Sequence, residues 1–398
     1  MAMDAYLEKL LYGMSSLAVF RGILEKQPIK AMYALLRTGD DALERTCAYA
    51  NLAEKIYEAG EDLTDAVITL VLESENLHIK RAAAAEKISA QLDECVQHEL
   101  EVLGEIAQIT PEQLAPLLKE GGFMPKWRTH EADIKALYAR RVKDVARFGY
   151  GIFAHYSMFY LDEGEITPVR YPDPIRLDDL IGYKLERGMV EDNTLALLEG
   201  KPAQNALLRG DAGTGKSSTV KALVNEYADR GLRLIEIKKG QLRQIPALLD
   251  ELSTNPLKFI IFIDDLSFST EDDDFGALKA MLEGSVAARA KNTAIYATSN
   301  RRHLIRESFS DRDGDDVHRN DTMQQLLSLS ARFGLKVTFS RPDKKAYLEI
   351  VNGLAERYGL DISHEKLAIE AEAFALAGSG RSARTAKQFI ESKLIEAD

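Results

Sequence analysis

The first part of the chain has apolar residues at helical spacing. Leu7, Leu10, Leu11 and Met14 fall on one face of a helix, and stretches as far as about residue 165 repeat this spacing. Prolines and one Gly-Gly pair interrupt the pattern and mark loops between the helices. The sequence therefore predicts an all-α N-terminal domain over residues 1–165.

Beyond residue 176 the apolar pattern changes to short runs that alternate with stretches of helical length. Phe259 to Ile263 is apolar at every position, which is typical of a strand buried on both faces of a parallel sheet. Strands that alternate with helices predict a parallel sheet covered by helices. We expect this α/β core over residues 177–340 and a small C-terminal helical lid over residues 341–398, where the spacing is helical again.

A proline-rich stretch separates these parts. Residues 166–176 contain Pro168, Pro172 and Pro174, and proline cannot continue a helix. We interpret the stretch as an extended linker. A chain of 398 residues is too long for one hydrophobic core, which agrees with a division into several domains.

Composition and charge narrow the class of protein. Apolar residues make up 45% of the chain and charged residues 29%, as in globular proteins. The net charge of −12 argues against a surface that coats nucleic acid. The two cysteines, Cys47 and Cys95, lack paired spacing, which fits a reducing compartment. We find no signal-peptide pattern and no apolar run of the roughly 18 residues that span a membrane, so we expect a cytoplasmic protein.

Candidate chemistry begins where a predicted strand meets a predicted helix. Gly210-x-x-x-x-Gly215-Lys216-Ser217 is the P-loop pattern, which binds nucleotide phosphates. Glycines let the backbone approach an anion closely, and backbone N–H groups at a helix N-terminus attract phosphate. We expect Lys216 to reach the β- and γ-phosphates and the Ser217 hydroxyl to bind Mg²⁺. The residues predicted to bind the nucleotide at this loop are Gly210, Asp211, Ala212, Gly213, Thr214, Gly215, Lys216, Ser217 and Ser218.

Polar residues also follow two later apolar runs. Asp264 and Asp265 come directly after the run that ends at residue 263. A carboxylate at the tip of a strand beside the P-loop strand can hold Mg²⁺, the Walker B arrangement, and we assign this role to Asp264 together with Ser217. Asn300 ends the run Ala-Thr-Ser-Asn after the next predicted strand. We expect Asn300 to orient the attacking water, and the alternative is an ordinary turn cap.

Two arginines complete the predicted site. Arg332, in Ser-Ala-Arg-Phe-Gly before the last predicted strand, could project from a subunit edge toward the γ-phosphate of a neighbouring subunit. Arg381, in Gly-Ser-Gly-Arg, could reach the γ-phosphate from the lid, with Arg384 as its substitute. The alternative for each is a solvated surface arginine.

The order of these motifs resembles that of the AAA+ ATPases. The resemblance implies that the chain binds ATP with Mg²⁺ and forms a homo-oligomer with a shared active site. It places Asn300 at sensor 1, Arg332 at the arginine finger and Arg381 at sensor 2. It also implies that Ile181 and Gly182, in Asp-Asp-Leu-Ile-Gly, pack on adenine.

The resemblance covers residues 176–398, and it is closer to one family within the superfamily than to the rest. The runs Asp-Asp-Leu-Ser-Phe (264–268), Asn-Arg-Arg-His-Leu (300–304) and Gly-Arg-Ser-Ala-Arg-Thr-Ala-Lys-Gln-Phe (380–389) are similar to a bacterial AAA-type ATP-binding family. That family is catalogued only as a domain of unknown function. The closer resemblance therefore implies ATP binding and supplies no biological role.

Two departures from the superfamily pattern bear on activity. AAA+ proteins usually carry Asp-Glu, with the glutamate as general base, where this chain has Asp264-Asp265. Because Asp265 is one methylene shorter than glutamate, we expect slow hydrolysis. Lys238-Lys239-Gly240 lacks the aromatic-apolar-Gly signature of the pore loop in protein-threading rings, which argues against an unfoldase.

The sequence favours a Mg²⁺-dependent ATPase that drives conformational change in a protein partner bound through the helical N-terminal domain. Two alternatives stay open. One is an ATP-dependent switch or scaffold with little hydrolysis, which Asp265 supports. The other is a nucleic-acid loader or motor, which the net charge of −12 disfavours.

Overall fold

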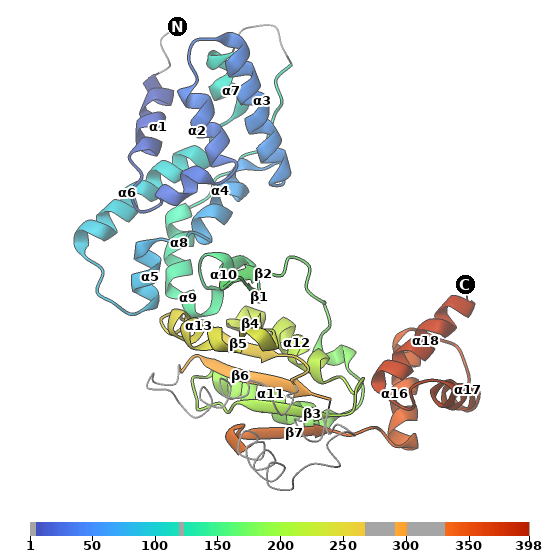
Figure 1. Cartoon of the computed structure of the whole chain (residues 1–398). Coiled ribbons are helices and arrows are strands. Elements are labelled where there is room, and N and C mark those ends of the chain that lie inside the picture. Colours follow the sequence, from blue (N-terminus) through green and yellow to red (C-terminus); the bar gives the residue numbers. More distant parts are fainter. Residues whose placement is uncertain (1–4, 119–122, 267–290, 301–330, 398) are drawn as a thin grey trace. The chain divides into compact units, whose positions relative to one another are not determined.

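The computed structural model describes residues 5–118, 123–266, 291–300 and 331–397 (Figure 1). The chain divides into two compact units, Met1–His155 and Tyr156–Asp398, called the N-terminal and C-terminal units below. No helix in the described part of the chain is long and apolar enough to cross a membrane.

The N-terminal unit is built from helices (Figure 1). Its described residues form a large hydrophobic core and a smaller cluster of Ile79, Val145 and Tyr150. Its α-helices are α1 (Ala5–Ser15), α2 (Ile29–Arg37), α3 (Ala42–Glu58), α4 (Leu63–Leu72), α5 (Leu77–Ala83), α6 (Ala90–Ala107), α7 (Pro111–Leu114), α8 (Ile134–Lys143), α9 (Val145–Phe148) and α10 (Ile152–His155). Several begin at a residue whose side chain accepts backbone N–H groups of the first turn, as Asp41 does from Leu43 and Glu44. The predicted helical character of this region is confirmed as far as His155.

A buried carboxylate fixes the segment between α1 and α2. Glu99 of α6 is 2% exposed, and its two oxygens accept the backbone N–H groups of Ala18, Val19 and Phe20 at 2.7 to 3.1 Å. These donors satisfy a charge that would be costly to bury alone. The Phe20 ring packs edge-on against Tyr138, with ring centroids 5.2 Å apart. Glu99 therefore ties this segment to the middle of the core.

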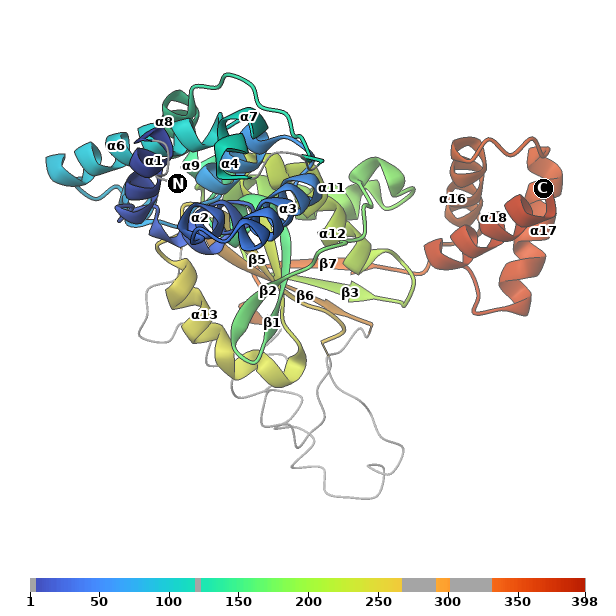
Figure 2. The same cartoon turned by 90° about the horizontal axis from the view of Figure 1, so that it is seen from above.

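The C-terminal unit is organised around a mostly parallel sheet (Figure 2). Within the described residues its strands are β1 (Met158–Asp162), β2 (Glu165–Pro168), β3 (Ala206–Gly210), β4 (Leu232–Glu236), β5 (Lys258–Ile263), β6 (Thr293–Ser299) and β7 (Leu335–Phe339). They lie in the order β2-β1-β4-β5-β6-β3-β7, with β1 and β2 antiparallel and the other neighbours parallel. Strands β4, β5 and β6 are buried at nearly every position, as a sheet covered on both faces requires. The predicted α/β fold class is confirmed.

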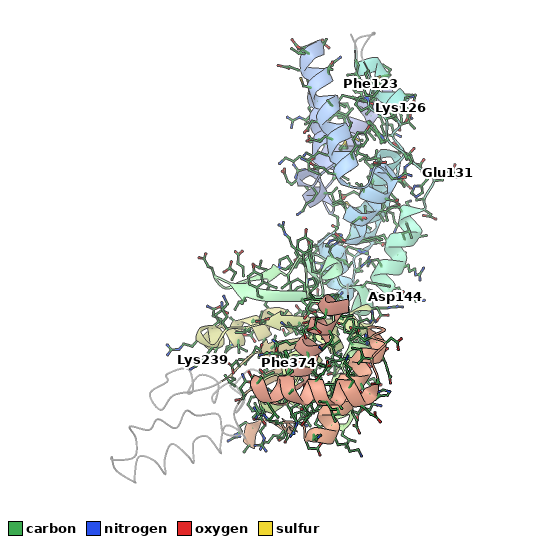
Figure 3. All side chains as sticks on the ribbon, turned by 90° about the vertical axis from the view of Figure 1, so that its right-hand side faces the viewer. Phe123, Lys126, Glu131, Asp144, Lys239 and Phe374 are labelled. Atoms are coloured by element: carbon green, nitrogen blue, oxygen red, sulfur yellow. The ribbon has the colours of Figure 1, made fainter. Side chains whose placement is uncertain are left out.

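Helices of this unit cover the sheet and form the lid. Among the described residues, the helices that accompany the sheet are α11 (Lys184–Leu198), α12 (Lys216–Tyr227) and α13 (Ile245–Leu252). The lid helices α16 (Lys344–Arg357), α17 (His364–Ala377) and α18 (Ala383–Ala397) share their own apolar core. Phe374 of α17, labelled in Figure 3, packs against Phe389 of α18, and the ring centroids are 5.7 Å apart. The lid is therefore a small packed bundle.

The prediction of helix up to residue 165 is wrong for its last part. Residues 158–168 form the β1–β2 hairpin, which joins the sheet beside β4. The two-residue turn between the strands has φ of 48° at Glu163 and 91° at Gly164, the positive values that tight hairpin turns require. The hairpin also takes up the first residues of the predicted linker. In β1, residues 159–162 alternate between buried and exposed, as in a strand with one solvated face.

A second correction concerns the strand that precedes Asp264. The sequence placed it beside the P-loop strand, but β6 lies between β5 and β3. The expected adjacency is wrong because strand pairing depends on tertiary packing, which a local pattern does not encode. Two further stretches lie outside the described residues: residues 275–290, whose sequence pattern predicts a helix, and the acidic residues 306–322, whose composition predicts a loop.

Candidate nucleotide-binding site

The P-loop lies where β3 ends and α12 begins. Gly210 has φ of 137°, and a Cβ atom there would lie 2.0 Å from the backbone oxygen of Phe339 in β7, so only glycine fits. Gly215, with φ of 88°, is the N-cap of α12. Both positions use the conformations that glycine alone adopts at little cost. The loop therefore has the strand, turn and helix context that the motif predicts.

Lys216 is buried at the start of α12, with 5% of its surface exposed. Its ammonium group donates to the backbone oxygens of Gly210 and Asp211 at 3.0 and 2.7 Å, and to Asn300 Oδ1 at 3.0 Å. Burial lowers the pKa of Lys216, and the Asp211 carboxylate is the first of several nearby charges that oppose this shift. These acceptors use all three N–H groups of the ammonium, so a phosphate bound at the same loop would take the place of at least one of them.

The two predicted acids lie together at the carboxyl end of β5. The Ser217 hydroxyl donates to Asp264 Oδ1 at 2.6 Å. The Thr298 hydroxyl of β6 donates to the same oxygen and accepts the Asp265 N–H at 2.9 Å. Asn300 Nδ2 donates to Asp265 Oδ1 at 2.8 Å. The structure therefore brings the predicted magnesium residues, the predicted base and Asn300 to one edge of the sheet.

A cavity of about 660 Å³ opens beside the P-loop. Residues 213–215 of the loop, the segment before α11, and helices α16 and α18 line it. Its volume is in the range of small-molecule sites. Ile181 and Gly182, predicted to pack on adenine, are in its wall. A Cβ atom on Gly182 would lie 2.9 Å from Ile350 Cγ1 of α16, so the wall segment packs directly on the lid.

The wall segment, residues 173–183, is held at its start and near its middle. Asn225 of α12 donates to two backbone oxygens near its start, at 2.8 and 2.7 Å. Arg357 of α16 pairs with the Asp179 carboxylate further along. The segment therefore connects the P-loop helix to the lid across one side of the cavity.

The two candidate lid arginines lie in different surroundings. Arg381 makes two hydrogen bonds, at 2.8 and 2.7 Å, to the Glu372 carboxylate of α17, and this pairing lowers the pKa of Glu372. Arg384 lines the cavity, and its backbone N–H donates to the Gly213 backbone oxygen at 3.0 Å. Its charge also contributes to the lowered pKa of Lys216. The structure thus brings Arg384, the substitute candidate, to the P-loop and leaves Arg381 within the lid.

Arg332 is exposed just before β7 and is not among the residues that line the cavity. Its predicted action on a neighbouring subunit stays a prediction.

Two contributors were not assigned from the sequence. Thr298 stands two residues before Asn300, so side-chain alternation along β6 was the signal available for it. The pair formed by Arg357 and Asp179 joins residues far apart in the sequence, and no local pattern pointed to it.

The residues present fit a nucleotide with Mg²⁺. The loop backbone makes a close approach that only glycine permits at Gly210, and a buried ammonium lies beside it. The hydroxyl of Ser217 and the carboxylate of Asp264 are hard oxygen donors within 2.6 Å of each other, the ligand chemistry that Mg²⁺ prefers. These are the groups that would hold the phosphates and the ion.

Fold and site together define a P-loop protein with a parallel sheet and a helical lid. The chain belongs to the family described as protein of unknown function (DUF815), whose model matches residues 154–396 of the 398. This confirms the predicted membership of a family without an assigned role.

None of the curated proteins matches the chain. Among the solved structures that match is a RuvB mutant from Thermogota maritima, with 17% sequence identity and a TM-score of 0.37. The alignment covers 55% of this chain and 64% of the RuvB chain, less than two thirds of that protein.

Proposed function

We propose that the chain is a Mg²⁺-dependent ATPase of the AAA+ type. The observation that carries this proposal is the hydrogen-bonded cluster at the sheet edge, in which Lys216, Ser217, Asp264, Asp265 and Asn300 meet. Three elements distant in sequence supply these side chains, and together they include a cation for phosphate, oxygen ligands for a metal and a carboxylate base. Such a set fits hydrolysis of a nucleoside triphosphate.

Each residue has a role in the reaction ATP + water → ADP + phosphate. Ser217 and Asp264 would hold Mg²⁺, which would supply positive charge to offset that of the phosphates. Asp265 accepts a proton from water as the water oxygen bonds to the γ-phosphorus and the bond to the leaving ADP oxygen breaks. Lys216 stabilises the charge on the transferred group, since positioned cations supply much of the catalysis in phosphoryl transfer.

Asn300 links the phosphate-binding lysine to the base. Its side-chain oxygen accepts from Lys216, and its amide nitrogen donates to Asp265 Oδ1. One amide group therefore fixes the spacing between the cation and the carboxylate, as expected of a residue that orients the attacking water. Asp265 has φ of 50°, a conformation that few residues other than glycine adopt.

A switch with little hydrolysis is the second candidate, and the geometry of Asp265 favours it. The side chain is shorter than that of the usual glutamate, and one of its carboxylate oxygens already accepts a hydrogen bond from the Asn300 amide at 2.8 Å. In this role ATP binding alone would set the arrangement of the lid, and the helical N-terminal unit would carry the protein partner.

Shared active sites between subunits are part of the proposal. Arg332 is exposed before β7, which is compatible with contact to a neighbouring subunit. Arg332→Ala is expected to keep ATP binding and lose turnover. Specific activity that rises with protein concentration would support assembly, and activity independent of concentration would remove the case for a shared site.

The test of the proposed function compares phosphate release and fluorescent-ATP binding for three proteins. These are the wild-type chain, Lys216→Ala, and the matched control Lys221→Ala on the same helix. We expect Lys216→Ala to lose binding and the control to retain it. Turnover in the wild type above the Lys216→Ala blank supports the ATPase, and binding without such turnover supports the switch. Equal binding by all three proteins refutes both.

A nucleic-acid motor stays the least favoured role. It predicts salt-dependent DNA binding, and an absence of binding at low salt would exclude it.

A further inference from the structure

A single hydroxyl group contacts both acids of the proposed ATPase site. Thr298 is 2% exposed. Its hydroxyl hydrogen is donated to Asp264 Oδ1, and its oxygen accepts the Asp265 N–H at 2.9 Å. A hydroxyl group can donate one hydrogen bond and accept others, so Thr298 acts as the donor in the first bond and as the acceptor in the second.

The strand order explains why Thr298 reaches both acids. Strand β6 lies between the P-loop strand β3 and the acid-bearing strand β5. Ile263 of β5 pairs with Ala297 of β6, which brings the following residue of each strand, Asp264 and Thr298, side by side. The backbone confirms this register, since the Leu266 N–H donates to the Thr298 backbone oxygen at 2.7 Å.

The first bond fixes the orientation of the proposed magnesium ligand. Asp264 Oδ1 accepts from the Ser217 hydroxyl at 2.6 Å, from the Thr298 hydroxyl, and from the Asp265 N–H at 3.2 Å. Of these donors, Ser217 is itself proposed to bind the ion. When Ser217 does so, Thr298 remains as the side-chain donor that holds the carboxylate in place.

The second bond fixes the backbone of the proposed base. Asp265 has φ of 50°, in the left-handed region that favours glycine. The bond from its N–H to Thr298 Oγ1 stabilises this conformation. In that conformation the Asp265 carboxylate meets the Asn300 amide at 2.8 Å.

We propose that Thr298 is a positioning residue that aligns both Asp264, for Mg²⁺, and Asp265, for the attacking water. The inference rests on the proposed function of the same site. Its specific content is that the hydroxyl, rather than the volume of the side chain, couples metal binding to the placement of the base.

The test uses Thr298→Val, which keeps the shape and removes the hydroxyl, and Thr298→Ser, which keeps the hydroxyl. The matched control is Thr194→Val, because Thr194 is also fully buried and hydrogen-bonded, but to Val190 and Tyr296. A fluorescent ATP analogue is titrated against each full-length protein with Mg²⁺ and with EDTA. The ratio of the two dissociation constants measures the contribution of Mg²⁺ to binding, and it does not depend on turnover.

We expect Thr298→Val to bind the analogue in EDTA as tightly as the wild type does. The ratio of its dissociation constants without and with Mg²⁺ should fall by about tenfold to a hundredfold, the usual effect of removing a partner of a metal ligand. Its kcat should fall by a similar factor. Thr298→Ser should stay within about threefold of the wild type in both measurements. Thr194→Val should keep the wild-type ratio even if its melting temperature falls.

If Thr298→Val has the same ratio of dissociation constants without and with Mg²⁺ as the wild type, the inference is overturned. Failure of Thr298→Ser to restore that ratio overturns it too, because the role would then be packing. If Thr298→Val does not fold, Thr298→Ala serves as the variant without the hydroxyl, with the same expectations. These outcomes are separate from failure of the proposed function, in which Lys216→Ala would bind the analogue as tightly as the wild type.

Discussion

Replacing Arg384 by alanine removes a guanidinium group that helix α18 brings to the P-loop. The backbone of Arg384 is fixed there by the 3.0 Å bond to the Gly213 backbone oxygen, and its charge already influences Lys216. A hydrogen bond to a charged group contributes about 1.5–3 kcal/mol, and each 1.4 kcal/mol is a factor of about ten in affinity. We therefore expect Arg384→Ala to weaken ATP binding by about tenfold to a hundredfold.

Arg381→Ala is the matched comparison, three residues away. Its guanidinium pairs with Glu372 inside the lid, so the variant should lower the midpoint of thermal unfolding and leave ATP affinity within about twofold of the wild type. Titration of a fluorescent ATP analogue, together with a thermal melt, measures both effects. If Arg381→Ala weakens binding and Arg384→Ala does not, the assignment made from the geometry is refuted and the one made from the motif stands.

Three further outcomes follow from the structure. Glu99→Gln makes one backbone N–H of residues 18–20 face an amide group instead of a carboxylate oxygen. The free energy of unfolding measured in urea should therefore fall by about 2–3 kcal/mol, and an unchanged urea midpoint would contradict this. Arg357→Ala breaks the pair with Asp179 at the cavity wall. Release of a fluorescent ADP analogue should therefore become about threefold to tenfold faster. An unchanged release rate would show that the pair does not restrain the wall. Burial lowers the pKa of His78, so protonation favours the unfolded chain. Stability should therefore decline as the pH falls below about 6.5, and His78→Gln should reduce that slope in denaturation curves recorded across this range.

The parts of the site that the sequence predicted are those whose geometry is encoded locally. The P-loop combines a glycine turn with a helix start within a few residues, so its pattern specifies its shape. Asp264 and Asp265 follow an apolar strand, and the carboxyl ends of parallel strands meet at one edge of a sheet. Local pattern and parallel strands together were enough to bring these residues to one place.

The parts that the sequence did not predict depend on packing between distant segments. Whether Arg381 or Arg384 lies at the P-loop depends on where α18 begins, because Arg384 is the second residue of α18 whereas Arg381 precedes the helix. The β1–β2 hairpin combines aromatic residues, which are frequent in strands, with a preceding helical stretch, and its pairing with β4 decides its conformation. Strand order follows from the same long-range contacts.

The position of β6 between β5 and β3 explains why Thr298 and Asn300 both reach the acid pair. Thr298 lies in β6, and Asn300 is the first residue after the strand. Both contact Asp265, one through its backbone and the other through its carboxylate. Because β6 separates β5 from β3, a pair of polar residues two apart at the end of β6 can bridge the P-loop lysine and the acid pair. The position of β6 therefore explains why the proposed base and the proposed metal ligand are held beside the P-loop lysine although their strand does not adjoin the P-loop strand.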